Sequence, residues 1–283
     1  MTQAQTFESP RTIDAALALL AETPLTILAG GTDVYPLHAG KQSPRAVLDV
    51  TRISELHGIA RRDGHWRIGA ATTWTHIAAA ELPSGFDGLK SAARQIGARQ
   101  VQNAGTIAGN LCTASPAGDG IPVLLSLDAS VELVSVRGTR TLPLTEFIVD
   151  YRRTALEPGE MVVAIHVPEA AADSASSFVK FGTREYLVIS LAMVAVSLNR
   201  TADGSVSRAR IAVGACSPVA RRLREVEDRL VSGGLSHTMT PVTRDDLSGL
   251  APIDDIRCSA DYRLDLVPTL VNRALRECGV TVP

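Results

Sequence analysis

ILAGGTDV at residues 27–34 and TIAGNLCTASPAGD at residues 106–119 are the two stretches from which the fold can be argued. In the first, an apolar strand at 25–29 runs directly into two glycines and a threonine. Because glycine tolerates positive φ, successive N–H groups in such a turn can point into one concavity and bind an anion. A tight turn without a ligand is the alternative. A Rossmann dinucleotide site is disfavoured, since no third glycine opens a helix here.

The second stretch belongs to a longer polar segment, residues 102–120, in which four glycines accompany a single carboxylate, Asp119. Apolar segments on both sides predict an ordered loop, and long loops in compact domains are usually functional. We expect this loop to wrap a polar ligand with N–H and hydroxyl donors. Two such segments suit a diphosphate held without many cations. Asp119 would accept a hydrogen bond from the ligand, or cap the helix that begins at Ile121, and the two roles are compatible.

Helix and strand signals alternate along the whole chain. Ile13, Ala16, Leu17 and Leu20 share one helical face and predict an amphipathic helix that Thr23-Pro24 ends. Strands are predicted at 25–29, 46–50, 66–70, 131–136, 161–167, 191–198 and 209–215, and helices at 76–80, 91–96, 221–231 and 263–278. This order indicates an α+β protein, and the small polar segment 169–177 is the best linker candidate.

The composition is that of a globular protein, with 45% hydrophobic and 20% charged residues. A formal net charge of -2 and an aromatic content of 4% argue against a nucleic-acid partner. The sequence contains no apolar run long enough to span a bilayer, no secretory signal in residues 1–12, and no C-x-x-C pair among its four cysteines. We therefore expect a reduced, cytoplasmic protein.

Three motifs resemble the FAD-binding medium subunit of the molybdenum hydroxylases, a group that includes xanthine dehydrogenases, aerobic carbon monoxide dehydrogenases and N-heterocycle hydroxylases. The motifs are AGGTD at 29–33, TIAGNLCTASPAGD at 106–119 and VKFGTRE at 179–185, and the likeness continues to CSADYRLDL at 258–266. The resemblance implies an FAD-binding fold of the vanillyl-alcohol-oxidase (PCMH) type. Its two α/β lobes would cover residues 1–56 and 57–172, and a C-terminal domain of a small antiparallel sheet and helices would cover 173–283.

The resemblance also implies which residues hold FAD. Residues 27–34 and the second loop would bind the pyrophosphate, and Asp119 would contact the ribityl or adenine side. Ile96 would lie against the flavin ring. Lys180 would approach a flavin carbonyl, where a cation stabilises the electron density of the reduced ring; a solvated lysine at a strand end is its alternative. The implied set is Ile27, Leu28, Ala29, Gly30, Gly31, Thr32, Asp33, Val34, Ile96, Thr106, Ala108, Gly109, Asn110, Thr113, Ser115, Asp119, Val162 and Lys180, with no catalytic residue and no metal ligand.

Two positions depart from the family pattern. Ala108 stands where the family usually has glycine, so the loop must accept a Cβ there. Tyr186, Leu187 and Val188 stand where members that reduce NAD often carry acidic residues. The electron acceptor therefore stays open. Tyr186 either shields one flavin face or packs against the core.

The implied function is electron transfer within a heterotrimer. A small partner with two [2Fe–2S] clusters would pass electrons to FAD, a large molybdopterin partner would oxidise the substrate, and NAD, a quinone, oxygen or another carrier would be the external acceptor. A self-standing flavin-dependent oxidase and a non-enzymatic assembly module are the alternatives. The six histidines show no spacing typical of a nucleophile and its base; they are His38, His57, His65, His76, His166 and His237.

Overall fold

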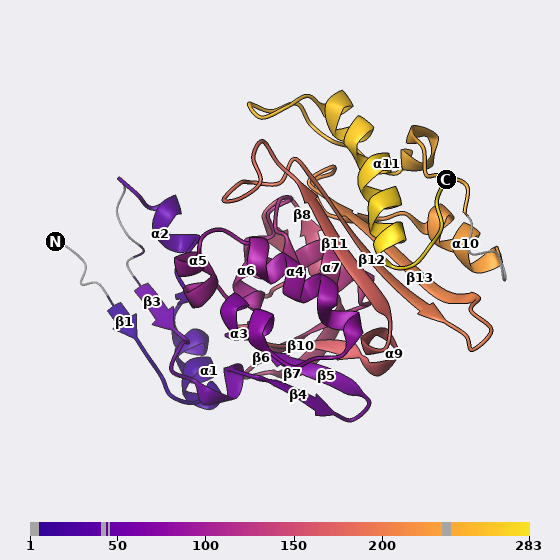
Figure 1. Ribbon diagram of the computed structural model, residues 1–283. Helices are drawn as coiled ribbons and strands as arrows, with labels where there is room; N and C mark the ends of the chain where they lie inside the picture. Colours follow the sequence, from indigo (N-terminus) through magenta and orange to yellow (C-terminus); the bar gives the residue numbers. More distant parts are fainter. Residues whose placement is uncertain (1–5, 41–43, 45, 234–238) are drawn as a thin grey trace.

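The computed structural model describes residues 6–40, 44, 46–233 and 239–283, and its sheets follow one another along the chain (Figure 1). The first sheet is parallel, with strand order β1-β3-β2. Helix α1 joins β1 to β2, and the Thr12 hydroxyl caps it by accepting from the N–H of Ala15 at 3.2 Å. This confirms the predicted first helix. The elements of this part are β1 (Thr6–Glu8), α1 (Ile13–Glu22), β2 (Thr26–Leu28), α2 (Val34–Leu37) and β3 (Ala46–Asp49).

The second sheet is antiparallel, with order β4-β5-β10-β6-β7. Its central strand β10 is apolar and almost entirely buried. A run of helices connects β5 to β6, and two of them, α4 and α7, pack against the third sheet. The elements here are η1 (Ser54–Leu56), β4 (Ile59–Arg62), β5 (His65–Gly69), α3 (Trp74–Ala79), η2 (Ser84–Phe86), α4 (Asp87–Gln95), α5 (Arg99–Ala104), α6 (Ile107–Thr113), α7 (Gly120–Ser126), β6 (Ser130–Ser135), β7 (Gly138–Pro143), α8 (Leu144–Phe147), β8 (Ile148–Asp150), β9 (Arg153–Thr154) and β10 (Met161–Pro168).

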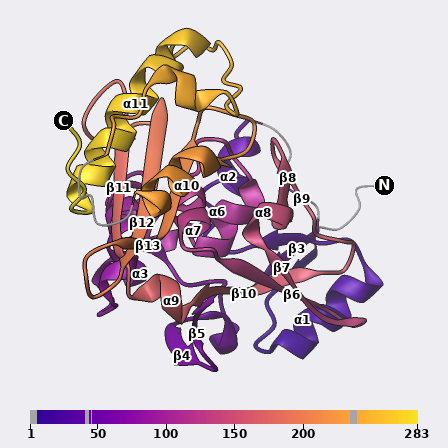
Figure 2. The ribbon, with the colours of Figure 1, turned by 90° about the vertical axis from the view of Figure 1, so that its right-hand side faces the viewer.

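The third sheet is antiparallel, with order β11-β12-β13-β14. It separates two hydrophobic cores, because alternate residues of a strand point to opposite faces. In β12, Met193 and Ala195 join the core shared with α4 and α7, whereas Val194 and Val196 join the core under α10 and α11. Figure 2 shows these last two helices on the outer side of the sheet. The elements are α9 (Glu169–Ala172), β11 (Ala175–Phe181), β12 (Ala192–Arg200), β13 (Val206–Gly214), β14 (Arg221–Arg222), α10 (Arg224–Ser232), η3 (Arg244–Leu247) and α11 (Ala260–Glu277).

One expectation about loops was wrong. Residues 102–120 are not one long loop, because α5 ends at Ala104 and α6 occupies Ile107–Thr113, with Ile107 and Leu111 buried on one face. Segment 169–177, the linker candidate, has regular structure: it forms α9 and the start of β11. Small residues there permit close packing, since a Cβ on Gly85 would lie 2.2 Å from the carbonyl oxygen of Ala171.

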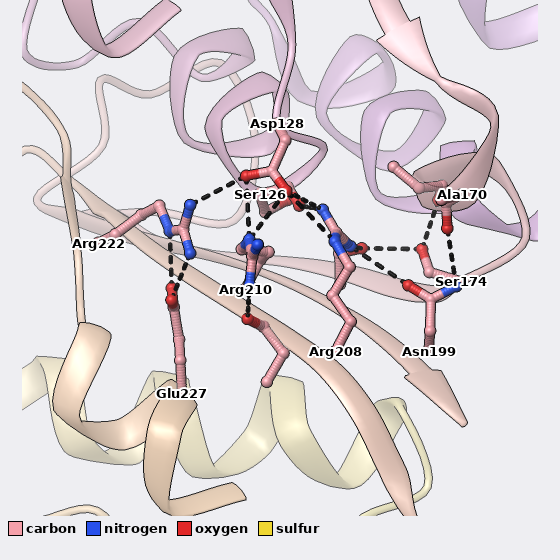
Figure 3. A network of polar contacts seen from close by, with 12 residues as sticks. Ser126, Asp128, Ala170, Ser174, Asn199, Arg208, Arg210, Arg222 and Glu227 are labelled. Carbon is pink, nitrogen blue, oxygen red and sulfur yellow. Dashed lines mark hydrogen bonds and ion pairs between the residues drawn. The ribbon is translucent and has the colours of Figure 1, made fainter. Parts of the chain in front are cut away.

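A cluster of charged groups joins the end of α7 to the third sheet (Figure 3). The Asp128 carboxylate accepts from Arg208 at 2.7 Å, from Arg210 at 2.9 Å and from Arg222 at 2.9 Å. Arg222 also donates to Glu227 of α10 at 2.8 Å. One carboxylate therefore binds two strands of the C-terminal sheet to the helices beside it.

Within the described ranges no helix combines the length and apolarity needed to cross a membrane. His237 lies outside the described residues.

Candidate functional site

A cavity of about 540 Å³ opens between the β2–α2 loop, helix α6 and strand β10. This volume lies in the range of small-molecule and cofactor sites. Nearly all residues of the expected set line it, although they come from distant parts of the sequence. Those in the lining are Ile27, Ala29, Gly30, Gly31, Thr32, Asp33, Val34, Ile96, Thr106, Ala108, Gly109, Asn110, Thr113, Ser115 and Val162.

The β2–α2 loop reaches the cavity because its two glycines allow a close backbone approach. Gly31 has a φ of 68°, a conformation that L side chains rarely adopt. A Cβ on Gly30 would lie 1.7 Å from the carbonyl oxygen of Ala104, so only glycine fits between this loop and the α5–α6 connection. Leu28 does not line the cavity; it is buried at the end of β2.

Backbone donors differ between the two expected phosphate-binding segments. In the described part of the chain, the N–H groups of Gly31, Thr32 and Asp33 donate to no protein acceptor. The first N–H groups of α6 are all engaged: Ile107 donates to Thr72, Ala108 to Ala70, and Gly109 to the Thr106 hydroxyl. At the start of α6, therefore, these N–H groups are not available to a ligand, and the expectation of N–H donors in the second segment is not met there. What α6 presents to the cavity is the side chains of Asn110 and Thr113.

Ala108 needs no special backbone conformation. It lies inside α6 with its N–H donating to Ala70, so the Cβ that the family pattern lacks is accommodated by an ordinary helix.

Asn110 carries an unsatisfied acceptor. Its Oδ1 is buried and has no hydrogen-bond partner among the described residues, and the residue lines both this cavity and its neighbour. An unpaired buried carbonyl costs about 1–3 kcal/mol. A ligand that brings an N–H group to this point would remove that cost, and the adenine and isoalloxazine rings of FAD both carry such donors. The residues present therefore fit the cofactor.

Asp33 and Arg152 form a polar corner of the same cavity. The Asp33 carboxylate accepts from Thr113 at 3.3 Å and from Arg152 at 3.4 Å. Arg152 has a φ of 52°, and its N–H donates to Ala114 at the end of α6. Sequence reasoning missed this arginine. The sequence offers only the pair Arg152-Arg153 as a signal, and the turn between β8 and β9 is what brings Arg152 to the cavity.

A second cavity of about 420 Å³ shares Ile96, Asn110 and Ala117 with the first. Here the Lys180 ammonium lies 2.6 Å from Asp119, with 7% of the lysine side chain exposed, so the solvated-lysine alternative is wrong. The Ser190 hydroxyl donates to the other Asp119 oxygen at 2.6 Å. The Asp119 side chain makes no capping bond to α7, which contradicts that role.

Burial raises the pKa of the Asp119 carboxyl above its ordinary value, while the charge and hydrogen bond of Lys180 and the hydrogen bond of Ser190 act in the opposite direction. Ser190 was not predicted from the sequence, because a lone serine after an apolar tripeptide carries no signal of its own. Tyr186 is 69% exposed, so its packing against the core is also excluded.

Comparisons with known proteins cover almost the whole chain, and they find FAD-binding subunits and flavoprotein domains of related enzymes. The family described as "FAD binding domain in molybdopterin dehydrogenase" matches residues 3–170, and "CO dehydrogenase flavoprotein C-terminal domain" matches residues 177–278. The putative xanthine dehydrogenase FAD-binding subunit of Escherichia coli K12 is 32% identical, covering 94% of this chain and 93% of that protein. The nicotinate dehydrogenase FAD-subunit of Eubacterium barkeri is 34% identical, covering 87% and 84%. A solved carbon monoxide dehydrogenase from Hydrogenophaga pseudoflava superimposes with a TM-score of 0.88, 28% identity and 98% coverage of both chains.

Proposed function

This chain belongs to the family of FAD-binding subunits of the molybdenum hydroxylases, and we propose that its two connected cavities hold one FAD molecule. As a member of that family it is an oxidoreductase subunit. The expected site residues keep the roles that the resemblance implies. The free N–H groups of Gly31, Thr32 and Asp33 receive the pyrophosphate, and the Lys180–Asp119 pair lies beside the flavin ring.

One observation carries this proposal: Gly31 and Asn110, which come from different segments, line the same cavity. Had they lain on opposite sides of the molecule, no single diphosphate could have contacted both. When bound, FAD supplies the redox chemistry itself, taking up and releasing electrons. The chain positions the cofactor, excludes water around it with the apolar side chains of Met161 and Val162 on β10, and places a buried cation near it.

The finer architecture is part of the same proposal. We assign the first two sheets and their helices to a PCMH-type FAD-binding fold, with lobes at 1–56 and 57–172, and residues 173–283 to the C-terminal flavoprotein domain. The two family matches, of which one ends at residue 170 and the other begins at 177, support the boundary at 172.

The partners in this proposal are a small [2Fe–2S] subunit and a large molybdopterin subunit, assembled as a heterotrimer in the cytoplasm. Relatives support it: carbon monoxide dehydrogenase of Hydrogenophaga pseudoflava has a medium chain that is 29% identical, and 6-hydroxypseudooxynicotine dehydrogenase of Paenarthrobacter nicotinovorans is a complex whose subunit alpha is 33% identical. Electrons pass from the clusters through FAD to an external acceptor. Co-purification of both partners with the tagged chain tests the assembly.

The FAD site is tested by Asn110→Leu, which removes the unsatisfied carbonyl. We expect the dissociation constant for FAD to rise at least about tenfold, equivalent to about 1.4 kcal/mol. The stability of the FAD-free chain should not fall, because the lost oxygen has no protein partner. Flavin absorbance and fluorescence during titration measure the binding, and urea unfolding measures the stability.

Asn103→Leu is the matched control, since Asn103 is exposed on the neighbouring helix α5 and lines neither cavity. It should bind FAD like the wild type. A gently purified wild-type chain without a flavin spectrum would favour the assembly module. Equal FAD affinity in both variants would remove Asn110 from the site. The self-standing oxidase is not favoured, and it would show itself if substrate bleached the flavin of the isolated chain.

A further inference from the structure

The loop between β11 and β12, residues 182–190, forms one wall of the second cavity. Its residues Leu187, Val188 and Ile189 line that cavity together with Ile96 and Lys180. The same loop exposes large apolar side chains: Leu187 is 54% exposed and Ile189 is 51% exposed. Apolar groups therefore extend from the cavity wall to the outer surface.

Hydrogen bonds and close packing hold this loop in the conformation that exposes its apolar side chains. At its base the N–H of Leu191 donates to the Phe181 carbonyl at 2.8 Å. At its tip the Arg184 guanidinium donates to the Leu187 carbonyl at 3.1 Å, where Leu187 has a φ of 53°. Near its start, a Cβ on Gly182 would lie 2.5 Å from Val188, so these two residues are in close contact. Exposing apolar side chains to water raises the free energy of the protein. Apolar side chains that the fold holds at the surface therefore indicate a site of contact with another apolar group.

The two cavities also differ in polarity. Hydroxyl side chains of Thr32, Thr106, Thr113 and Ser115 line the first, whereas no serine or threonine lines the second. The only charged side chains that line the second cavity are Lys180 and Asp119, and they neutralise each other at 2.6 Å. On the loop, Arg184 and Glu185 carry opposite charges. In the described lining of this cavity, a second diphosphate would find no hydroxyl side chain and no cation other than the paired Lys180.

We propose that this loop admits an uncharged, apolar quinone as the external electron acceptor. The inference rests on the proposed function, because the electrons come from FAD, whose flavin ring that function places beside Lys180 in the cavity that this loop borders. Reduced FAD gives two electrons and two protons to the quinone, whose two carbonyl oxygens become hydroxyls, and oxidised FAD is regenerated. A nicotinamide dinucleotide would bring its charged diphosphate to an apolar rim, which disfavours it as the acceptor.

The test uses the purified complex with its FAD, reduced under anaerobic conditions and mixed rapidly with one acceptor at a time. The acceptors are a short-chain ubiquinone, NAD⁺, oxygen and ferricyanide, and the recovery of flavin absorbance gives each rate constant. We expect ubiquinone to reoxidise the flavin faster than NAD⁺ or oxygen does. Ile189→Ser should slow the ubiquinone reaction about five- to tenfold, because half-exposed isoleucine contributes on the order of 1 kcal/mol of apolar contact.

Ferricyanide, a small ion that needs no apolar contact, is the reference acceptor: Ile189→Ser should slow the ubiquinone reaction by a clearly larger factor than it slows the ferricyanide reaction. Val136→Ser is the control: Val136 is exposed at the β6–β7 turn, away from both cavity linings, and this variant should match the wild type with every acceptor. Leu187→Asn is a second variant that keeps the left-handed backbone, and it should also slow ubiquinone.

The inference is overturned if NAD⁺ or oxygen is the faster acceptor, or if both loop variants keep the wild-type ubiquinone rate. Either result leaves the FAD site intact, provided that the flavin is present and is reduced. A complex without flavin would overturn the proposed function, and this inference would fall with it.

Discussion

At the scale of single residues, Ser190 connects the proposed cofactor site to the loop beside it. Its hydroxyl is buried and donates to Asp119, whose other oxygen binds Lys180. A hydrogen bond to a buried charged group contributes about 1.5–3 kcal/mol. Ser190 is therefore a positioning residue, which orients the carboxylate and fixes the end of the 182–190 loop.

Ser190→Ala should destabilise the chain by about 1.5–3 kcal/mol at pH 7. The sign of its pH dependence follows from Asp119. A carboxyl with a raised pKa in the folded state favours folding most at low pH, and this contribution is lost as pH rises through the folded pKa. Without the serine that pKa rises further, so the deficit of the variant should grow with pH. Urea unfolding at several pH values measures it.

Ser54→Ala provides the comparison, since Ser54 donates to the Glu55 carboxylate on the surface at 3.0 Å. It should change stability by less than about 0.5 kcal/mol at every pH. Ser190→Thr keeps the hydroxyl and should restore the pH profile. A Ser190→Ala deficit that is the same at low and neutral pH would show that the serine only fills space.

At the scale of elements, the site depends on how closely the β2–α2 loop approaches the α5–α6 connection. Gly30 lies against the Ala104 carbonyl, and Gly31 turns the chain with positive φ. Above this contact, the side chains of α6 face the loop across the cavity. The cavity wall is therefore formed by two elements in contact, the β2–α2 loop and the α5–α6 connection. A single methyl group between them should force them apart and widen the cavity.

Gly30→Ala should destabilise the chain by about 2–3 kcal/mol, because the new Cβ overlaps backbone atoms that cannot move independently. It should also abolish retention of FAD during purification. Gly249→Ala is the matched control, since a Cβ there meets no atom within 4 Å and should change stability by less than about 0.5 kcal/mol. Calorimetric melting and the visible spectrum give the two readouts. Normal FAD content in Gly30→Ala would contradict the close approach.

The sequence predicted about half of the helices and strands, because their signals are local. The spacing of Ile13, Ala16, Leu17 and Leu20 alone places these side chains on one helical face, and the last three are buried in α1. It did not predict α6, because polar and small residues resemble a loop until burial of Ile107 and Leu111 is known. Likewise Arg152 and Ser190 reach the site only through tertiary contacts, which a linear pattern does not contain. Glycine positions were easier to interpret, since close approach restricts them to one residue type.

At the scale of the whole molecule, the second cavity depends on the placement of the third sheet. Lys180 lies in β11 of that sheet, and its partner Asp119 precedes α7. At the other end of α7, Asp128 binds Arg208, Arg210 and Arg222 (Figure 3). Two ionic contacts at the two ends of one helix therefore hold the C-terminal sheet against the cofactor-binding part.

The Asp128 contact should be the stronger structural determinant of the two. Partial burial acts to raise the pKa of its carboxyl, but hydrogen bonds and charges from Arg208 and Arg210 outweigh it, so the pKa lies below its ordinary value. A carboxyl whose pKa is lowered by folding stabilises the protein above its ordinary pKa, near 4, and this contribution is lost as pH falls through the folded value.

Asp128→Asn should therefore destabilise the chain by about 2 kcal/mol at pH 7, because three guanidinium groups lose a shared anion that is still partly accessible to water. The deficit should shrink below about pH 4, where the wild-type carboxyl itself becomes protonated. Asp245→Asn, at an exposed position in η3, should match the wild type throughout. Because α7 links this contact to Asp119, the variant should also lose FAD at lower urea concentrations than those that unfold the first sheet. A pH-independent deficit, or FAD release that coincides with complete unfolding in both proteins, would show that the contact stabilises the sheet without holding the cofactor site in place.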